Sequence, residues 1–126
     1  MLLDTCVVID VLRGREAAVA FVEGLPVRPS LSVITATELL AGVRGSRERR
    51  TIERLFQVYA VCDVGLAVAG LAGDYVREYG PSHNVDPLDP LDALIAATAK
   101  VHGLDLATLN LKHFPMFGGL SRPYGA

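Results

Sequence analysis

The sequence has few of the residues that build disulfide frameworks and zinc sites, with two cysteines and three histidines among 126 residues. Cys6 and Cys62 each lie beside valines, and their spacing matches neither a disulfide framework nor a zinc site. We therefore expect two buried, reduced thiols, as is usual for a cytosolic protein.

The sequence also lacks an excess of charge of either sign. Twelve Lys and Arg residues nearly balance fourteen Asp and Glu, which leaves a net charge of −2. This balance argues against a broadly basic surface that grips nucleic acid by phosphate neutralisation alone. Because 51% of the residues are hydrophobic, a disordered chain is excluded as well.

Long hydrophobic runs are absent too. The longest stretch without a charged residue is Val64 to Gly73, far short of a membrane span. Residues 1–12 contain two aspartates and no Lys or Arg, so they lack the basic start of a secretion signal. We expect a cytoplasmic protein that has no membrane partner and forms a single domain, residues 1–126.

Short β-rich runs alternate with longer helical patterns, which is typical of an α/β domain with a parallel sheet. The pattern predicts a small sheet of four to five strands flanked by helices on both sides. The expected strands are Met1–Asp4, Ser30–Ile34, Ala60–Val64, Leu104–Leu109 and a weak edge strand, Ser121–Tyr124, that contains Pro123. The expected helices are Cys6–Leu12, Glu16–Val22, Thr35–Val43, Arg47–Tyr59, 65–79 and Leu91–His102, with a polar loop at Pro81–Pro87.

Four polar residues fall at or near the carboxyl ends of these strands, where α/β sheets usually carry their sites. Asp4 ends the first strand, and Asn110 follows the fourth. Glu38 and Asp92 are expected in the first turns of their helices. These four residues are the candidate catalytic residues.

Each of the three acids also has a structural interpretation, because acids are common at helix starts. Asp4 is suited to be the N-cap of the helix that follows it. Thr35 and Glu38 match a capping box, in which two side chains bond free backbone amides. The segment Asp89–Asp92 matches a helix start with Asp89 as the N-cap, proline next and an acid in the first turn.

Helix capping alone does not require three elements to bring carboxylates to the same edge of a sheet. Clustered acids raise one another's pKa, so such a cluster persists mainly when a cation neutralises it. The donors are all oxygens, which favours Mg²⁺, or Mn²⁺, over zinc. Since Mg²⁺ usually binds one or two carboxylates plus phosphate oxygens, a phosphate-bearing substrate is expected.

Four segments, in order, resemble the PIN-domain ribonucleases, and in particular the VapC-type toxins of bacterial toxin–antitoxin pairs. They are Leu2–Asp10, Ser32–Gly42, Asp92–Ala99 and Thr108–Phe114, and the likeness runs over nearly the whole chain. The resemblance implies a metal-dependent endoribonuclease with a small parallel sheet. It also implies a homodimer and a cognate antitoxin whose C-terminal segment covers the active site.

The resemblance also assigns roles by position. Asp4 and Asp92 match the family's metal-binding aspartates, and Glu38 matches its conserved acid. Asn110 falls where the family often places a fourth acid, although asparagine is also familiar there in this subgroup. Because an amide brings no charge to a second metal, we expect one ion rather than two. Glu38 would then orient or deprotonate a water for in-line attack on RNA.

Some other polar residues have more than one open interpretation. Thr5 and Thr108 either support the site with their hydroxyls or act only in packing and capping. The stretch Arg44–Arg54 is a solvated helix face, an RNA-backbone contact or a docking strip for an acidic antitoxin segment. The remaining candidates are expected to be solvated or turn residues: Asp10, Asp63, Asp74, His83, Asp86, Asp105 and His113.

Two other enzyme classes fit the sequence less well. A haloacid-dehalogenase-type phosphatase needs a second Asp two residues after Asp4, and this position is Cys6. A phospho-receiver domain would use Asp63 and an adjacent acidic pair after the first strand, but Asp4 is followed by Thr5. The alternative that remains open is a non-catalytic module that binds RNA or a partner on the same fold.

Overall fold

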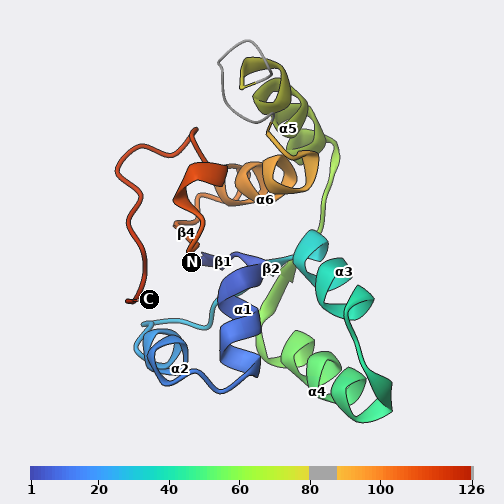
Figure 1. Cartoon of the computed structure of the whole chain (residues 1–126). Coiled ribbons are helices and arrows are strands. Elements are labelled where there is room, and N and C mark those ends of the chain that lie inside the picture. Colours follow the sequence, from blue (N-terminus) through green and yellow to red (C-terminus); the bar gives the residue numbers. More distant parts are fainter. Residues whose placement is uncertain (80–87, 126) are drawn as a thin grey trace.

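The computed structural model describes residues 1–79 and 88–125 (Figure 1). Four parallel strands form one sheet in the order β3-β2-β1-β4, as the sequence predicts. The predicted polar loop Pro81–Pro87, which contains His83 and Asp86, lies outside the described residues. The strands are β1 (Leu2–Leu3), β2 (Ser30–Ser32), β3 (Ala60–Cys62) and β4 (Leu106–Ala107).

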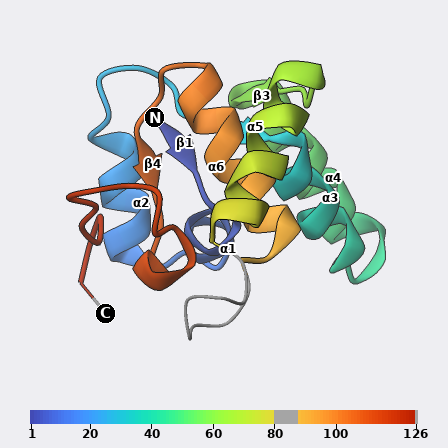
Figure 2. The same cartoon turned by 90° about the horizontal axis from the view of Figure 1, so that it is seen from above.

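Helices cover both faces of this sheet (Figures 1 and 2). The two residues of β1 point to opposite faces, as neighbouring strand residues do. Leu3 packs with residues of α1, α3 and α4, whereas Leu2 packs with residues of α6. The helices are α1 (Thr5–Leu12), α2 (Glu16–Glu23), α3 (Val33–Ala41), α4 (Gly45–Val58), α5 (Leu66–Glu78) and α6 (Pro90–Val101), followed by the short 3₁₀ helix η2 (Leu111–His113).

Helix α6 is the most enclosed helix, because it lies between the sheet and α5 (Figure 1). Ile95 and Ala96 face the sheet, and Ala93 and Ala97 face α5. The small alanines let α5 and the sheet approach α6 closely from both sides. This close packing holds the start of α6 at the edge where the parallel strands end.

The start of α3 differs from the sequence prediction. Strand β2 ends at Ser32, and the helix begins at Val33 because the Ser32 hydroxyl accepts a hydrogen bond from the backbone N–H of Ile34 (3.1 Å). The prediction that the strand runs to Ile34 was therefore wrong. The capping box of Thr35 and Glu38 was also wrong, since both residues lie inside the helix.

The C-terminal segment also differs from the prediction. Residues Ser121–Tyr124 form no strand, in accord with Pro123, which lacks the amide donor that a strand needs. Side chains hold this segment instead: the Tyr124 hydroxyl donates a hydrogen bond to Asp10 Oδ2 (2.7 Å). Arg15 donates to the same oxygen (3.1 Å), so Asp10 is not the solvated acid that the sequence analysis expected.

The expected buried thiols are only half-buried, for both Cys6 and Cys62. Cys6 is open on one side because it lies at the start of α1, at the edge of the sheet. In the part of the chain that the structure describes, no helix combines the length and the apolar character needed to cross a membrane.

Candidate functional site

Asp4 follows β1 directly and is buried, with 5% of its surface exposed. Its Oδ1 accepts a hydrogen bond from the backbone N–H of Thr5 (2.8 Å), so Asp4 is the N-cap of α1. Its Oδ2 accepts a hydrogen bond from the Thr108 hydroxyl at the end of β4 (2.7 Å). The capping role is therefore confirmed, and it leaves the second carboxylate oxygen facing the next strand.

Thr108 is fully buried and ties the end of β4 to Asp4. Its hydroxyl oxygen also accepts a hydrogen bond from the backbone N–H of Asn110 (3.0 Å). The Asn110 side chain is exposed and makes no hydrogen bond to any residue that the structure describes. The backbone of Asn110 is thus held next to Asp4 by Thr108, while its side-chain amide is available to a ligand.

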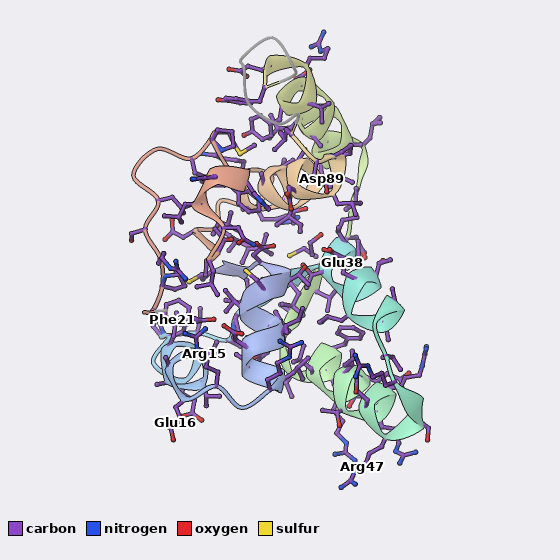
Figure 3. The ribbon with its side chains drawn as sticks, viewed as in Figure 1. Arg15, Glu16, Phe21, Glu38, Arg47 and Asp89 are labelled. Atoms are coloured by element: carbon purple, nitrogen blue, oxygen red, sulfur yellow. The ribbon has the colours of Figure 1, made fainter. Side chains whose placement is uncertain are left out.

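Glu38 reaches the same edge from α3. Its Oε1 accepts a hydrogen bond from the Thr5 hydroxyl (2.8 Å), which also lies 3.0 Å from the Thr35 hydroxyl. Figure 3 shows Glu38 on the side of α3 that faces α1. Thr5 and Thr108, for which a site role and a packing role were both open, therefore each donate a hydrogen bond to an acid: Thr5 to Glu38 and Thr108 to Asp4.

Asp92 joins the cluster from the first turn of α6. Burial raises the pKa of Asp92 to about 6, and the negative charges of Asp4, Asp89 and Glu38 add to the rise. The nearby His113, with Nδ1 3.3 Å from Asp92 Oδ2, opposes it. The charges of acids from three different elements thus act on one carboxyl group.

Asp89 begins α6, as the sequence predicts. Its side chain (Figure 3) accepts a hydrogen bond from the backbone N–H of Leu91 (2.8 Å), and Pro90 is the first residue of the helix. The cap leaves Asp92 with no capping task, so its side chain is available to the cluster.

Two residues beside the acids were missed as site residues by the sequence analysis. His113 contacts Asp92, and the Cys6 thiol lies 3.4 Å from Asp4 Oδ2. Burial raises the pKa of Cys6, and the charge of Asp4 adds to this rise. No sequence pattern marked His113, because the short turn of η2 determines its direction. Cys6 is two residues after Asp4, and this proximity was the only available signal.

The basic stretch begins at Arg44, just before α4, and continues along this helix to Arg54. Arg49 pairs with Glu53 (3.7 Å), and Figure 3 shows Arg47 pointing away from the sheet. Arg44, Arg47, Arg50 and Arg54 are exposed and make no ion pair within residues 1–79 and 88–125. Local pairing therefore explains only one of the five arginines.

The carboxylates of Asp4 and Asp92 are the two side chains of the cluster that could hold a divalent cation. Within the described residues, no three His, Cys, Asp or Glu side chains form a group that could hold a metal ion. Mg²⁺ usually binds through one or two carboxylates and keeps several waters. Asp4 and Asp92 offer two carboxylates, and Asp4 raises the pKa of Asp92. A divalent cation would relieve this repulsion.

Comparisons with known proteins identify a family and relatives that this chain resembles. The family model of the PIN domain matches residues 1–115. Ribonuclease VapC10 of Mycobacterium tuberculosis (strain H37Rv) is 42% identical over 128 residues, which cover 98% of this chain and 92% of the relative. Ribonuclease VapC19 of the same strain is 40% identical over 126 residues, which cover 98% of each protein.

Solved structures show the same fold. A toxin–antitoxin complex from Klebsiella pneumoniae contains a chain that matches with a TM-score of 0.83 and 27% identity, covering 99% of this chain and 98% of that one. A chain of the DNA-bound VapBC complex from Salmonella typhimurium matches with a TM-score of 0.78 and 26% identity, covering 96% and 94%.

Proposed function

The chain belongs to the PIN-domain family, and from this we propose that it is a metal-dependent endoribonuclease and the toxin of a toxin–antitoxin pair. The names of its relatives support RNA as the substrate. One observation on this chain carries the proposal: Asp4, Glu38 and Asp92 come from three elements and gather at one edge of the sheet.

Asp4 and Asp92 would hold one Mg²⁺, or Mn²⁺, ion beside the scissile phosphate. When bound there, such an ion would supply a more acidic water and would offset negative charge at the phosphate. The protein's own task is to fix the carboxylates in advance. Thr108 and the N–H of Thr5 fix Asp4, while His113 restrains Asp92.

Glu38 would orient the attacking water or accept its proton. Its Oε1 is occupied by the Thr5 hydroxyl, and this contact directs the carboxylate toward α1. The other oxygen, Oε2, is left for the water. Asn110, with its exposed amide, would donate a hydrogen bond to the substrate without adding charge.

The proposed partners are a cognate antitoxin and a second copy of the chain. Similar structures include a toxin–antitoxin complex from Klebsiella pneumoniae and DNA-bound VapBC from Salmonella typhimurium, which supports a protein partner. The unpaired arginines of α4 offer an acidic segment of the antitoxin, or the RNA backbone, a complementary charge. A toxin that cleaves cellular RNA would act in the cytoplasm.

The substitution Asp4→Asn tests the proposed chemistry. Asparagine caps a helix about as well as aspartate, so the start of α1 should be kept while the charge is lost. We expect the variant to lose RNA cleavage with Mg²⁺ or Mn²⁺ and to lose toxicity to growing cells. Asp63→Asn, at the exposed carboxyl end of β3, is the control and should keep both activities.

Two outcomes would contradict the proposal in different ways. Undiminished cleavage by Asp4→Asn would overturn the role of the acid cluster. A wild-type protein that binds RNA but cleaves none with any divalent ion would instead support the non-catalytic binding module.

A further inference from the structure

A second feature of the same edge is a cavity of about 320 Å³ beside the acid cluster. It is lined by the segment Leu109–His113 and by Arg122 from the C-terminal segment. The lining therefore brings together a lysine, a histidine, an arginine and an asparagine, and it contains no acid. Its charge is opposite to that of the neighbouring carboxylates.

Two walls of the cavity are joined directly to the candidate active site. The backbone N–H of Asn110 donates to the Thr108 hydroxyl, which itself donates to Asp4. His113 lies 3.3 Å from Asp92 through its Nδ1 atom. A polymer whose scissile phosphate meets Asp4 and Asp92 would therefore pass the cavity within a short distance.

The cations of the cavity are not neutralised by the protein itself. Lys112 and Arg122 are exposed, and neither makes an ion pair or hydrogen bond to another residue in the described part of the chain. Arg and Lys are the residues that bind phosphate with charge-assisted hydrogen bonds. No Phe, Tyr or Trp side chain lines the cavity, so its charged groups favour a phosphate over a stacked base.

The position of Arg122 depends on contacts that neighbouring residues of the C-terminal segment make with α1 and α2. Two residues later, Tyr124 donates to Asp10 and lies under the Arg15 guanidinium, which is 5.3 Å from the ring centroid. Arg15 also donates to the Gly125 carbonyl (2.9 Å). The C-terminal segment is thus held against α1 and α2, and its Arg122 lines the cavity together with Lys112.

We propose that this cavity binds a backbone phosphate of the RNA strand next to the phosphate that is cleaved. Lys112 and Arg122 bind the phosphate oxygens, and the Asn110 amide donates a further hydrogen bond. The inference rests on the proposed ribonuclease function and adds to it a binding subsite. Such a contact positions the strand and carries no sequence information of its own.

The test compares Lys112→Ala/Arg122→Ala with the wild-type protein on a labelled single-stranded oligoribonucleotide that the wild type cleaves. We expect KM to rise about tenfold or more, since hydrogen bonds to charged groups are lost, while kcat stays the same. The slope of log affinity against log salt should become shallower by roughly 0.7 to 1. Arg13→Ala/Arg28→Ala removes the same charge from exposed positions away from the cavity and should leave KM unchanged.

A second probe locates the phosphate on the RNA. Single uncharged methylphosphonate linkages are placed in turn along the same oligonucleotide. An uncharged linkage at one position next to the cleaved bond should raise KM for the wild type. The same linkage should leave the already raised KM of Lys112→Ala/Arg122→Ala unchanged. This lack of additivity is the sign of a direct contact between that phosphate and the substituted residues.

The outcomes separate this inference from the proposed function. If the wild type cleaves RNA and Lys112→Ala/Arg122→Ala has the same KM and the same salt slope as the wild type, the phosphate site is overturned and the proposed function is not. If the wild type cleaves nothing, the proposed function fails.

The subsite is then tested by binding of the same RNA in EDTA, measured by fluorescence anisotropy. Equal affinity of the wild type and Lys112→Ala/Arg122→Ala overturns the subsite. A loss of affinity that Arg13→Ala/Arg28→Ala does not share supports it. A double variant that loses only antitoxin binding assigns the cavity to an acidic protein segment, against our inference.

Discussion

Each of two carboxylates in the candidate site is held by the hydroxyl of a threonine. Thr108 donates to Asp4, and Thr5 donates to Glu38. A hydroxyl has one proton to donate and can accept as well, so Thr108 also receives the N–H of Asn110. These neutral donors orient the acids without cancelling the charge that a metal ion needs.

The substitution Thr108→Val should therefore weaken both stability and cleavage. Valine keeps the shape but removes the donor to Asp4 and the acceptor for the N–H of Asn110, in a fully buried position. We expect a loss of about 1–3 kcal/mol in the free energy of unfolding, measured by urea denaturation. Thr37→Val, whose exposed hydroxyl bonds only the Val33 carbonyl, is the control and should cost less than about 0.5 kcal/mol. Equal losses for the two variants would argue against the role of Thr108.

The raised pKa of Asp92 predicts how metal-free stability depends on pH. The pKa rises from 3.8 to about 6 on folding, so the folded state binds a proton that the unfolded state has released. This contribution is fully present below pH 3.8 and is lost as the pH rises through about 6. In EDTA, the wild-type Tm measured relative to Asp92→Asn should therefore fall across this window.

If Asp4 and Asp92 hold the proposed metal ion, magnesium should reverse this loss above pH 6, because binding to the ionised carboxylates would stabilise the folded state. The Tm of the wild type should rise with Mg²⁺ concentration, and the Tm of Asp92→Asn should rise much less. If the Tm of the wild type does not change with Mg²⁺ concentration at neutral pH, this result would count against a metal site at Asp92.

Among the helices, α3 shows how a single cap can move the start of a helix. Val33 and Ile34 favour a strand by their branched side chains, yet the Ser32 hydroxyl caps the helix and the strand stops. As a result, Glu38 lies beyond the first turn, free of capping, and reaches Thr5.

The substitution Ser32→Ala should destabilise the protein by about 1 kcal/mol through the lost N-cap of α3. Ser46→Ala, in the exposed first turn of α4, makes no such cap and should leave the unfolding midpoint nearly unchanged. Thermal or urea unfolding of the two variants measures the difference. A Ser32→Ala variant as stable as Ser46→Ala would mean that the helix start is set by packing instead.

The sequence predicts those parts of the fold that depend on local pattern and on parallel strands. The four strands and Asp89 as the cap of α6 were found because their signals are local. The gathering of Asp4, Glu38 and Asp92 followed from the common edge at which parallel strands end. The contact between His113 and Asp92 had no such signal, since only the packing of η2 against α6 brings the two together.

Over the whole molecule, the C-terminal segment acts as a clamp on the opposite end of the chain. Burial raises the pKa of Tyr124, and so does its hydrogen bond to Asp10. The ring also packs against Phe21, with 6.1 Å between centroids, and Figure 3 shows Phe21 and Arg15 on the side of α2 near this segment. No sequence pattern predicts the clamp, because its partners are separated by more than one hundred residues.

Tyr124→Phe tests the clamp by removing one hydroxyl. We expect a loss of about 1–2 kcal/mol in the free energy of unfolding, because a hydrogen bond to a carboxylate disappears. KM for RNA should also rise, since Arg122 would lose its fixed position. Tyr59→Phe removes a hydroxyl that makes no hydrogen bond to another described residue and should change neither quantity. A Tyr124→Phe variant that behaves like Tyr59→Phe would show that the hydroxyl does not hold the segment.

The central place of β1 in the sheet also governs when the acids come together during synthesis. β1 is made first, yet one of its two neighbours is β4, and Asp4 meets Thr108 across 104 positions of sequence. A ribosome must therefore translate nearly the whole chain before β4 can pair and Asp92 and Thr108 can approach Asp4. The nascent chain accordingly emerges without the assembled acid cluster, which can form only when translation is almost complete.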